Sequence, residues 1–267
     1  MKITWIDRKS ALVRPFLLIL ALVGLSACNT ADSDKTVAQD QPTTEEDTGM
    51  EITIPSTTDF DVTGDGSNPA WENAEWATLS PLSGPLGEPE HDYATRFKML
   101  YSETGLYVLF DGEDRALTAT LDGDYLKLWT EDVFEFFFWT DEQHPIYFEY
   151  EISPLGYELP LIIPNFDGDF FGWIPWQYEG ERRTRKAVAI VGGPQESGAA
   201  IEGWRAEIFV PYDVLAPLQN VPPQPGMHWR ANFYRIDYDD GKTTYWSWSP
   251  VERTFHEYER FGAIIFE

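Results

Sequence analysis

The sequence predicts an all-β fold, an antiparallel, jelly-roll-like β-sandwich, on three observations. Short runs rich in aromatic and β-branched residues, which favour strands, recur from about residue 95 to the C-terminus. Turn-forming residues separate these runs, as they do in sandwiches and barrels. Beyond about residue 30, no segment has the apolar spacing of a long helix.

The expected strands follow the runs in chain order. They cover residues 95–101, 106–110, 133–139, 146–152, 187–191, 204–210, 229–236, 244–249 and 262–266. The first two should form a hairpin, because residues 102–105 place a glycine between two strand-like runs. The run 133–139 is almost wholly apolar, which is typical of a central strand covered on both faces.

Acidic and apolar side chains alternate in the run 146–152. Glu149 and Glu151 fall on one face, and Phe148, Tyr150 and Ile152 fall on the other. This pattern predicts a strand with one packed face and one polar face.

Residues 155–177 are predicted to form a surface loop, because prolines and glycines interrupt the segment. Trp173 and Trp176 lie within it and are candidates to extend a binding surface.

The N-terminus has the features of a lipoprotein signal peptide. Basic residues precede an apolar run from Pro15 to Leu25, which is shorter than the about 20 residues that a membrane-spanning helix needs. Small residues then precede Cys28, the only cysteine of the chain. We expect a signal peptide over residues 1–27, lipidation at Cys28, a disordered linker over residues 28–52 and the β domain over residues 53–267. An ordinary signal peptide with a coincidental cysteine is the alternative.

The predicted location is the cell envelope, outside the cytoplasm. Asn29 is not the aspartate that in some bacteria retains lipoproteins in the inner membrane, so the outer membrane is favoured.

The charge argues against polyanionic ligands. The net charge is -26, and removal of residues 1–27 takes away four basic residues and one acidic residue, which leaves about -29. Such a field repels nucleic acid and also sulfated or uronate-rich glycans. A neutral ligand is therefore expected.

A series of short motifs spans nearly the whole predicted domain. In chain order they are Asp65-Gly66 with Trp71, Leu106-Tyr107-Val108, the run 129–135 (Trp-Thr-Glu-Asp-Val-Phe-Glu), Phe148-Glu149 to Gly156, the run 203–207 with Pro211, the run 229–235, Trp248-Ser249-Pro250, and Phe255-His256 with Phe261-Gly262. With these motifs in this order, the chain resembles the family 9 carbohydrate-binding modules and their relatives among the DOMON-like sandwiches.

The resemblance implies an antiparallel sandwich that binds a sugar, often the end of a glycan chain, between two aromatic side chains. The corresponding positions here are Trp129 and Phe255. The sugar-binding members carry tryptophan at the second position. Phenylalanine offers a smaller face and no N–H donor, so the exchange affects affinity more than the class of ligand.

A sugar site also needs polar groups, because the rim of a pyranose ring both donates and accepts hydrogen bonds, and carboxylates and guanidinium groups suit that rim. The candidates near the matched loops are Glu135, Glu149, Glu151, Tyr234, Arg235 and Arg253. Several alternatives stay open. Glu135 could be satisfied by an internal arginine, Glu149 and Glu151 could lie on an outward polar face, and Arg235 could pair internally with Glu135 or Glu207. The tryptophans inside strands, Trp204, Trp229 and Trp248, are expected in the core.

Structural calcium is the one cofactor that the resemblance implies. Acidic, glycine-containing turns could supply its oxygen ligands at Asp65, Asp111, Asp114, Asp122 and Asp124, although none has the spacing of a defined calcium loop.

Two other functions compete with sugar capture. Glu149 and Glu151, with Cα atoms about 6.6 Å apart on a strand, could form a glycosidase pair, and related modules are attached to xylanases. Other DOMON-like sandwiches bind haem, for which Met50, Met99, Met227, His91, His144, His228 and His256 could serve as axial ligands. The expected role is non-catalytic support of polysaccharide capture or breakdown, beside a separate glycosidase or transporter.

Overall fold

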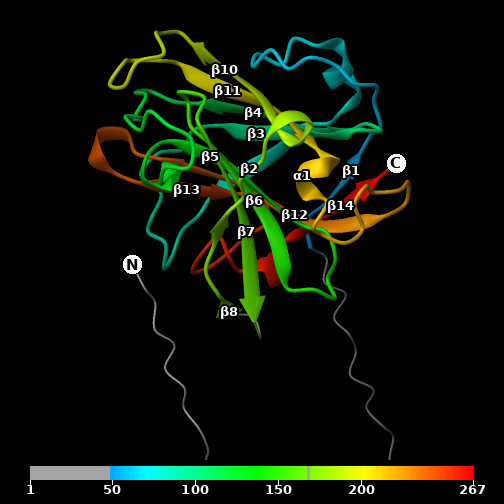
Figure 1. Cartoon of the computed structure of the whole chain (residues 1–267). Helices are drawn as coiled ribbons and strands as arrows, with labels where there is room; N and C mark the ends of the chain where they lie inside the picture. The colour runs from blue at the N-terminus through cyan, green and yellow to red at the C-terminus, as the bar shows by residue number, and fades with distance from the viewer. Residues whose placement is uncertain (1–48, 167–168) are drawn as a thin grey trace, which may run out of the picture. The chain divides into compact units, whose positions relative to one another are not determined.

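Two layers of strands make up the folded part of the chain, of which the computed structural model describes residues 49–166 and 169–267. One layer contains β2 (Ala77–Pro81), β3 (Thr95–Tyr101), β4 (Gly105–Glu113), β10 (Arg185–Val191) and β11 (Gly203–Pro211), in the order β10-β11-β4-β3-β2 (Figure 1). Neighbouring strands in this layer are antiparallel. The expected hairpin is confirmed between β3 and β4, where the amide of Ser102 donates to the carbonyl of Gly105 over 2.8 Å.

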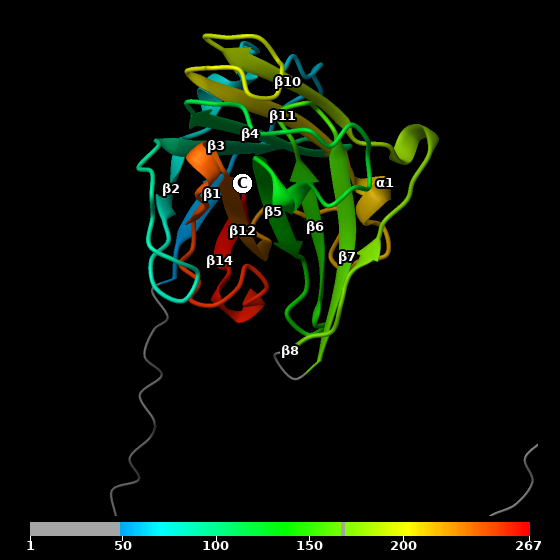
Figure 2. The same cartoon turned by 90° about the vertical axis from the view of Figure 1, so that its left-hand side faces the viewer.

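The second layer carries the candidate site. It contains β1 (Glu51–Ile54), β5 (Val133–Trp139), β6 (Ile146–Ile152), β7 (Glu158–Phe166), β12 (His228–Asp237), β13 (Thr244–Ser247) and β14 (Gly262–Phe266), with the two-residue strands β8 (Asp169–Phe170) and β9 (Ile174–Pro175) against β7. Figure 2 shows β12, β5, β6 and β7 side by side. Strands β2 and β13 pair with each other and so join the two layers. The predicted sandwich is therefore confirmed, and β1 with β14 is its one parallel pair among the described strands.

Helices are short in the described residues. The α-helix α1 covers Tyr212–Leu215, and 3-10 turns cover Pro69–Asn73, Leu128–Thr130, Gly180–Arg182, Asp239–Gly241 and Tyr258–Arg260. None of the helices between residues 49 and 267 is long and apolar enough to cross a bilayer.

The main core lies between the layers. Phe97 of β3 stacks on Phe233 of β12 with ring centroids 3.6 Å apart, and Phe110 of β4 stacks on Phe134 of β5 at 4.8 Å. Trp204, Trp229 and Trp248 are buried in this core as expected. Phe148, Tyr150 and Ile152 of β6 also belong to it, which confirms the predicted packed face of that strand.

A second apolar cluster covers the opposite face of β5, β6, β7 and β12. The chain between β13 and β14 lies over this face and contributes Val251, Phe255, Tyr258 and Phe261. Strand β5 is thus buried on both faces, as its apolar sequence predicted. The face that Glu149 and Glu151 share is consequently a covered surface instead of an open polar one.

The prediction for residues 155–177 is wrong. This segment is not a single loop, because residues 158–164 of β7 pair with β6. Pro160 and Pro164 are tolerated there because the other side of β7 faces only the short strands β8 and β9, where missing N–H groups cost little. The first strand, β1, begins at Glu51, close to the predicted start of the β domain at residue 53. The predicted signal peptide, Cys28 and most of the linker lie outside the described residues.

Candidate functional site

A cavity of about 310 Å³ opens on the outer face of β5 and β6. Small-molecule sites have volumes of roughly 300–1,000 Å³, so the cavity is large enough for a small ligand. Its lining is mostly apolar and aromatic, with carboxyl groups among the rings. The lining residues are Leu86, Trp129, Glu135, Phe137, Glu149, Glu151, Leu161, Phe170, Trp173, Ile236, Tyr245, Arg253, Thr254, Phe255 and His256.

Trp129 and Phe255 both line this cavity, so the structure brings together the two rings that the resemblance points to. Trp129 lies in the turn Leu128–Thr130, where its amide donates to Glu151 Oε2 over 3.0 Å and its carbonyl accepts from the Tyr238 hydroxyl over 2.8 Å. These two bonds fix the backbone that carries the indole ring.

Phe255 comes from the segment between β13 and β14. Its ring stacks on Tyr234 with centroids 4.0 Å apart, and its carbonyl accepts from the Tyr234 hydroxyl over 2.8 Å. Tyr245 and Phe255 also meet edge to face, with ring centroids 5.9 Å apart. Tyr234 is fully buried and does not line the cavity, so it acts as the support of Phe255 and not as a direct ligand.

Three carboxyl groups lie along the floor of the cavity. In the register of the sheet, Glu135 of β5 is opposite Glu151 of β6, and Phe137 is opposite Glu149. All three side chains are at least 96% buried, with exposed fractions of 2% for Glu135, 4% for Glu149 and 1% for Glu151. Glu149 Oε2 has no hydrogen-bond partner among the described residues.

Burial raises the pKa of each of these carboxyl groups above 4.5 because desolvation disfavours the charged form. The neighbouring carboxyl groups raise the pKa of Glu135 and Glu151 further by repulsion. A side-chain hydrogen bond between Glu149 and Glu151 lowers the pKa of the first and raises that of the second. The floor of the cavity therefore offers both hydrogen-bond donors and acceptors.

His256 forms part of the wall beside Glu149. Its Nδ1 lies 2.7 Å from the Tyr147 hydroxyl and 3.8 Å from Glu149 Oε2. Burial lowers the pKa of His256 to about 4, so the imidazole is neutral at physiological pH. Phe170 stacks on it from the rim with centroids 4.2 Å apart.

The two arginine candidates differ in position. Arg253 lines the cavity at its exposed edge, where its Nε is 3.0 Å from Glu257 Oε1. Arg235 lies elsewhere, contrary to its prediction as a ligand. It is fully buried on the inner face of β12, and its Nη2 is 2.6 Å from Asp237 and 3.2 Å from Asp114. Its internal partners are thus neither Glu135 nor Glu207.

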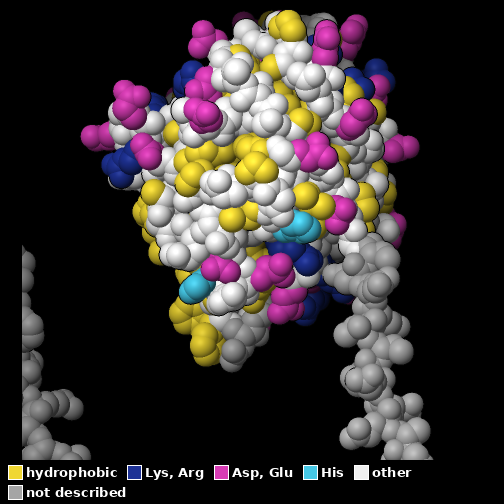
Figure 3. Space-filling model, turned by 90° about the vertical axis from the view of Figure 1, so that its right-hand side faces the viewer, with side chains coloured by type: hydrophobic (Ala, Val, Ile, Leu, Met, Phe, Trp, Pro, Cys, Tyr) yellow, Lys and Arg dark blue, Asp and Glu magenta, His cyan; other side chains and the backbone are white. Residues whose placement is uncertain are grey.

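Apolar side chains extend from the cavity along the strands β7 to β9. Phe170 and Trp173 line the cavity and are also exposed, and the Trp173 ring meets Trp129 edge to face at 6.0 Å. Phe166, Phe171 and Ile174 are exposed in the same segment. In Figure 3 apolar side chains gather at the lower tip, which β7 and β8 form in Figure 1, while acidic groups are scattered over the rest of that face. Trp176 is not part of this rim, because its Nε1 donates to the carbonyl of Val214 over 2.8 Å.

Some lining residues were missed in the sequence. Phe137 follows Glu135 by two residues, and Ile236 follows Tyr234 by two, so strand alternation places each on the same face as its predicted neighbour. Leu86 and Phe170 come from segments without such a signal, since only the fold brings them to the cavity.

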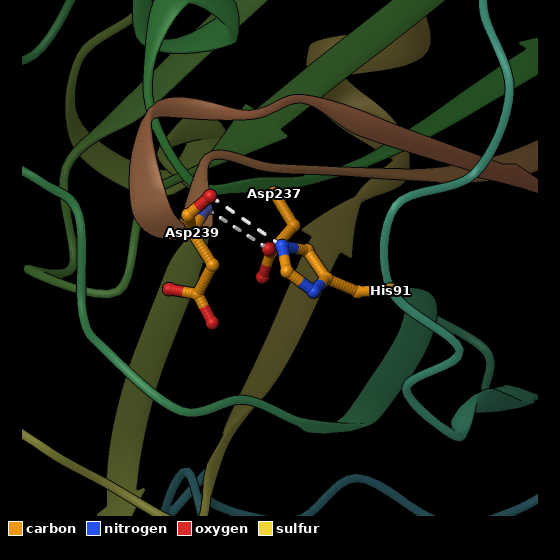
Figure 4. Close-up of side chains that lie close together, drawn as sticks. All are labelled: His91, Asp237 and Asp239. Atoms are coloured by element: carbon orange, nitrogen blue, oxygen red, sulfur yellow. Dashed lines mark hydrogen bonds between the residues drawn. The ribbon is translucent and has the colours of Figure 1, made fainter.

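Two groups of residues that could hold an ion meet at Asp237, the last residue of β12. Asp114, Asp132 and Asp237 form one group and His91, Asp237 and Asp239 another, each with ligand atoms within 4.8 Å of one another. Figure 4 shows the second group, in which His91 Nε2 is 3.4 Å from the carbonyl of Asp239 and the amide of Asp239 donates to Asp237 over 3.3 Å.

Calcium prefers oxygen ligands, and Asp239 Oδ1 is a buried oxygen with no partner in the described part of the chain. The donor set therefore fits calcium, although the Arg235 guanidinium already balances part of the charge. Among the acidic turns predicted from the sequence, only Asp114 joins these groups. Asp65 accepts bonds from Thr63 and Ser67, Asp111 pairs with Arg96 and Arg205, and Asp124 pairs with Lys186.

The two-layered antiparallel fold, with an aromatic cavity on one outer face, defines a β-sandwich binding module for carbohydrate. The chain belongs to Carbohydrate-binding family 9, whose profile matches residues 73–266. This family consists of non-catalytic binding modules, so the alternative of a glycosidase pair at Glu149 and Glu151 is wrong.

Solved structures share the fold at low sequence identity. A candidate carbohydrate-binding protein from Bacteroides uniformis is 16% identical with a TM-score of 0.67, over 82% of this chain and 100% of that one. A family 9 module from Caldicellulosiruptor kristjanssonii in complex with cellotriose is 14% identical with a TM-score of 0.56, over 82% of this chain and 94% of that one. A family 9 module from Caldicellulosiruptor kristjanssonii in complex with glucose is 14% identical with a TM-score of 0.55, over 82% of this chain and 96% of that one. No curated protein matches the chain.

Proposed function

We propose that the cavity binds a neutral sugar, or the end of a neutral glycan chain, between Trp129 and Phe255. The observation that carries this proposal is the meeting of both rings and three buried carboxyl groups in one cavity. Flat rings suit the C–H face of a pyranose, and a protonated carboxyl group can both donate to its hydroxyl groups and accept from them. The similar modules solved with glucose and cellotriose support this class of ligand.

Calorimetric titration of the purified protein with glucose, cellobiose and xylobiose tests the proposal. We expect Trp129→Ala and Phe255→Ala each to weaken binding at least ten-fold, because loss of an aromatic contact removes about 1–3 kcal/mol. Trp76→Ala is the matched control, since this indole packs under Arg96 away from the cavity. Binding that survives both cavity substitutions would place the sugar elsewhere. If no sugar bound, a search for a Soret band after reconstitution would test the haem alternative, with His256 as the cavity ligand.

The proposed place of action is the outer membrane. We propose that the signal peptide over residues 1–27 directs export, that Cys28 is lipidated, and that the segment up to about residue 50 tethers the module beside a glycosidase or a transporter. The order of basic, apolar and small residues before Cys28 supports this proposal. Fractionation of cells that express Cys28→Ser is the test. The substituted protein should move from the membrane to the soluble fraction, and an unchanged distribution would contradict lipid anchoring.

We also propose that calcium binds at the acidic groups around Asp237 and Asp239. The unpartnered Asp239 Oδ1 supports this proposal, and the ion would neutralise part of the buried negative charge. Millimolar calcium should raise the melting temperature of the protein and not that of Asp239→Asn. Equal shifts for both proteins would contradict a site there.

A further inference from the structure

The floor of the cavity has three acidic groups and no cationic partner for them among the described residues. Glu135, Glu149 and Glu151 lie within one cavity, and no lysine or arginine of residues 49–166 and 169–267 forms an ion pair with any of them. Buried carboxyl groups are normally paired with a cation or with several hydrogen-bond donors. Here the Trp129 amide donates to Glu151, while Glu149 Oε2 has no partner in the described residues.

The basic side chains nearest to the floor do not supply the missing charge. Arg253 is directed to Glu257, and its side chain is 79% exposed. His256 is 3.8 Å from Glu149 but is neutral, as described above. The protein itself therefore supplies no cation to the floor, and the protons that the raised pKa values keep there are what a bound cation would replace.

A metal ion fits this position poorly. The three carboxyl groups are not among the acidic groups of the described chain whose oxygen atoms lie within 4.8 Å of one another. They are spread along the floor beneath the rings of Trp129, Phe137 and Phe255. A larger organic cation matches both features, because aromatic faces attract cations and carboxylates bind ammonium groups through charge-assisted hydrogen bonds.

We propose that the cavity is selective for amino sugars, whose ring stacks on Trp129 and Phe255 while the ammonium group binds the unpartnered Glu149 carboxyl group. This inference rests on the proposed sugar site and replaces the neutral ligand proposed for it by a cationic sugar of the same ring shape. The negative field of the whole chain acts in the same direction, because a net charge of -26 attracts cationic ligands.

Binding of a cation should displace protons from the floor. The groups that face Glu149 are Glu135 and Glu151 on the sheet, His256 and Tyr147 on the wall, and Tyr234 behind Phe255. Among these, the carboxyl groups with raised pKa values hold the protons that an approaching ammonium group would displace. The affinity for an amino sugar should therefore increase as the pH rises, until the amine itself loses its proton, whereas the affinity for a neutral sugar should show no such increase.

Three disaccharides with the same β-1,4 linkage separate the effect of charge from that of shape. We would titrate the purified protein in about 0.15 M salt, where long-range attraction is screened over about 8 Å, with the disaccharide of glucosamine, its N-acetylated form and cellobiose. The glucosamine disaccharide should bind at least ten-fold more tightly than the other two. Its binding should also release protons. The buffer takes these protons up, so the measured enthalpy of binding should differ between buffers of different ionisation enthalpy.

Glu149→Gln removes the group that can ionise on binding and keeps the shape of the side chain. In this variant the affinity ratio between the glucosamine disaccharide and cellobiose should fall to about one, while the exposed control Glu252→Gln should keep the wild-type ratio. Equal affinities in the wild type, or a ratio that survives Glu149→Gln, would overturn the amino-sugar inference and leave the sugar site in place. If none of the three ligands bound, the proposed function itself would fail.

Discussion

Arg235 shows how one side chain can be assigned by its burial and partners. It is enclosed between Asp114 and Asp237, and its Nη1 also donates to Thr95 Oγ1 over 3.0 Å. The sequence could have ruled out part of the predicted ligand set, because Tyr234 and Arg235 are adjacent on a strand and must point to opposite faces. Only the pairing of β12 with β5 shows which of these two side chains lies on the face of the sheet that carries the cavity.

Replacement of Arg235 by methionine should destabilise the protein strongly. The change leaves the aspartates around it without their guanidinium partner, and loss of one member of a buried ion pair costs about 3–5 kcal/mol. The matched change Arg260→Met, in which the arginine pairs with Glu252 at the surface, should cost about 0–1 kcal/mol. Urea unfolding of both variants measures the difference. Similar midpoints would mean that the aspartates are protonated or bound to another cation.

At the scale of elements, the segment that carries Phe255 is attached to the sheet by Asn232 of β12. Its Oδ1 accepts from the amide of Ser249 over 2.8 Å, and its Nδ2 donates to the carbonyl of Ser249 over 2.9 Å and to the Tyr234 hydroxyl over 2.7 Å. Asn232 is fully buried, so these bonds are made away from water. The position of Phe255 thus depends on a residue that never touches the cavity.

Asn232→Ala should weaken sugar binding without removing any group from the cavity. Loss of these bonds leaves buried polar groups unsatisfied, at a cost of about 1–3 kcal/mol each. The segment after β13 and the Tyr234 side chain that supports Phe255 then each lose a fixed contact. Calorimetry should show weaker binding, and hydrogen exchange should show lower protection at Ser249. Unchanged affinity in a folded variant would mean that the β13–β14 segment is held by its other contacts.

Sequence patterns predicted some strands better than others. The apolar run of β5 predicted burial on both faces, and the alternation in β6 predicted which residues share a face, although the face of Glu149 and Glu151 is covered. Strand β7 was missed because Pro160 and Pro164 disfavour a central strand, and only its position beside β8 and β9 makes them acceptable. The motifs led to Trp129 and Phe255, whereas the cavity floor depends on the register between β5 and β6, which is not a local property.

At the scale of the whole molecule, buried acids make stability depend on pH. Glu135, Glu149 and Glu151 have raised pKa values in the fold, so the native state binds more protons than the unfolded chain above pH 4.5. Their contribution to stability is intact below the unfolded pKa and is lost progressively as the pH rises towards the folded pKa values.

The free energy of unfolding should therefore fall as the pH rises from about 4.5 through neutrality. Urea titrations at several pH values measure the slope. Glu135→Gln, which cannot ionise, should give a shallower slope than the wild type, and the exposed control Glu252→Gln should not. A slope that the substitution at the cavity floor leaves unchanged would assign the pH dependence to other groups.

The parallel pair of β1 and β14 has a mechanical consequence. Residues 50–57 are bonded to both layers: the amide of Ala263 donates to the carbonyl of Met50, and the amides of Thr57 and Tyr101 bond to the carbonyls of Tyr101 and Pro55. A pull on the proposed N-terminal tether, for example from a glycan fibre held in the cavity, would reach the sandwich through this ladder first. The force would be shared between β14 and β3. The first and last strands, β1 and β14, would therefore hold the two layers of the sandwich together under tension.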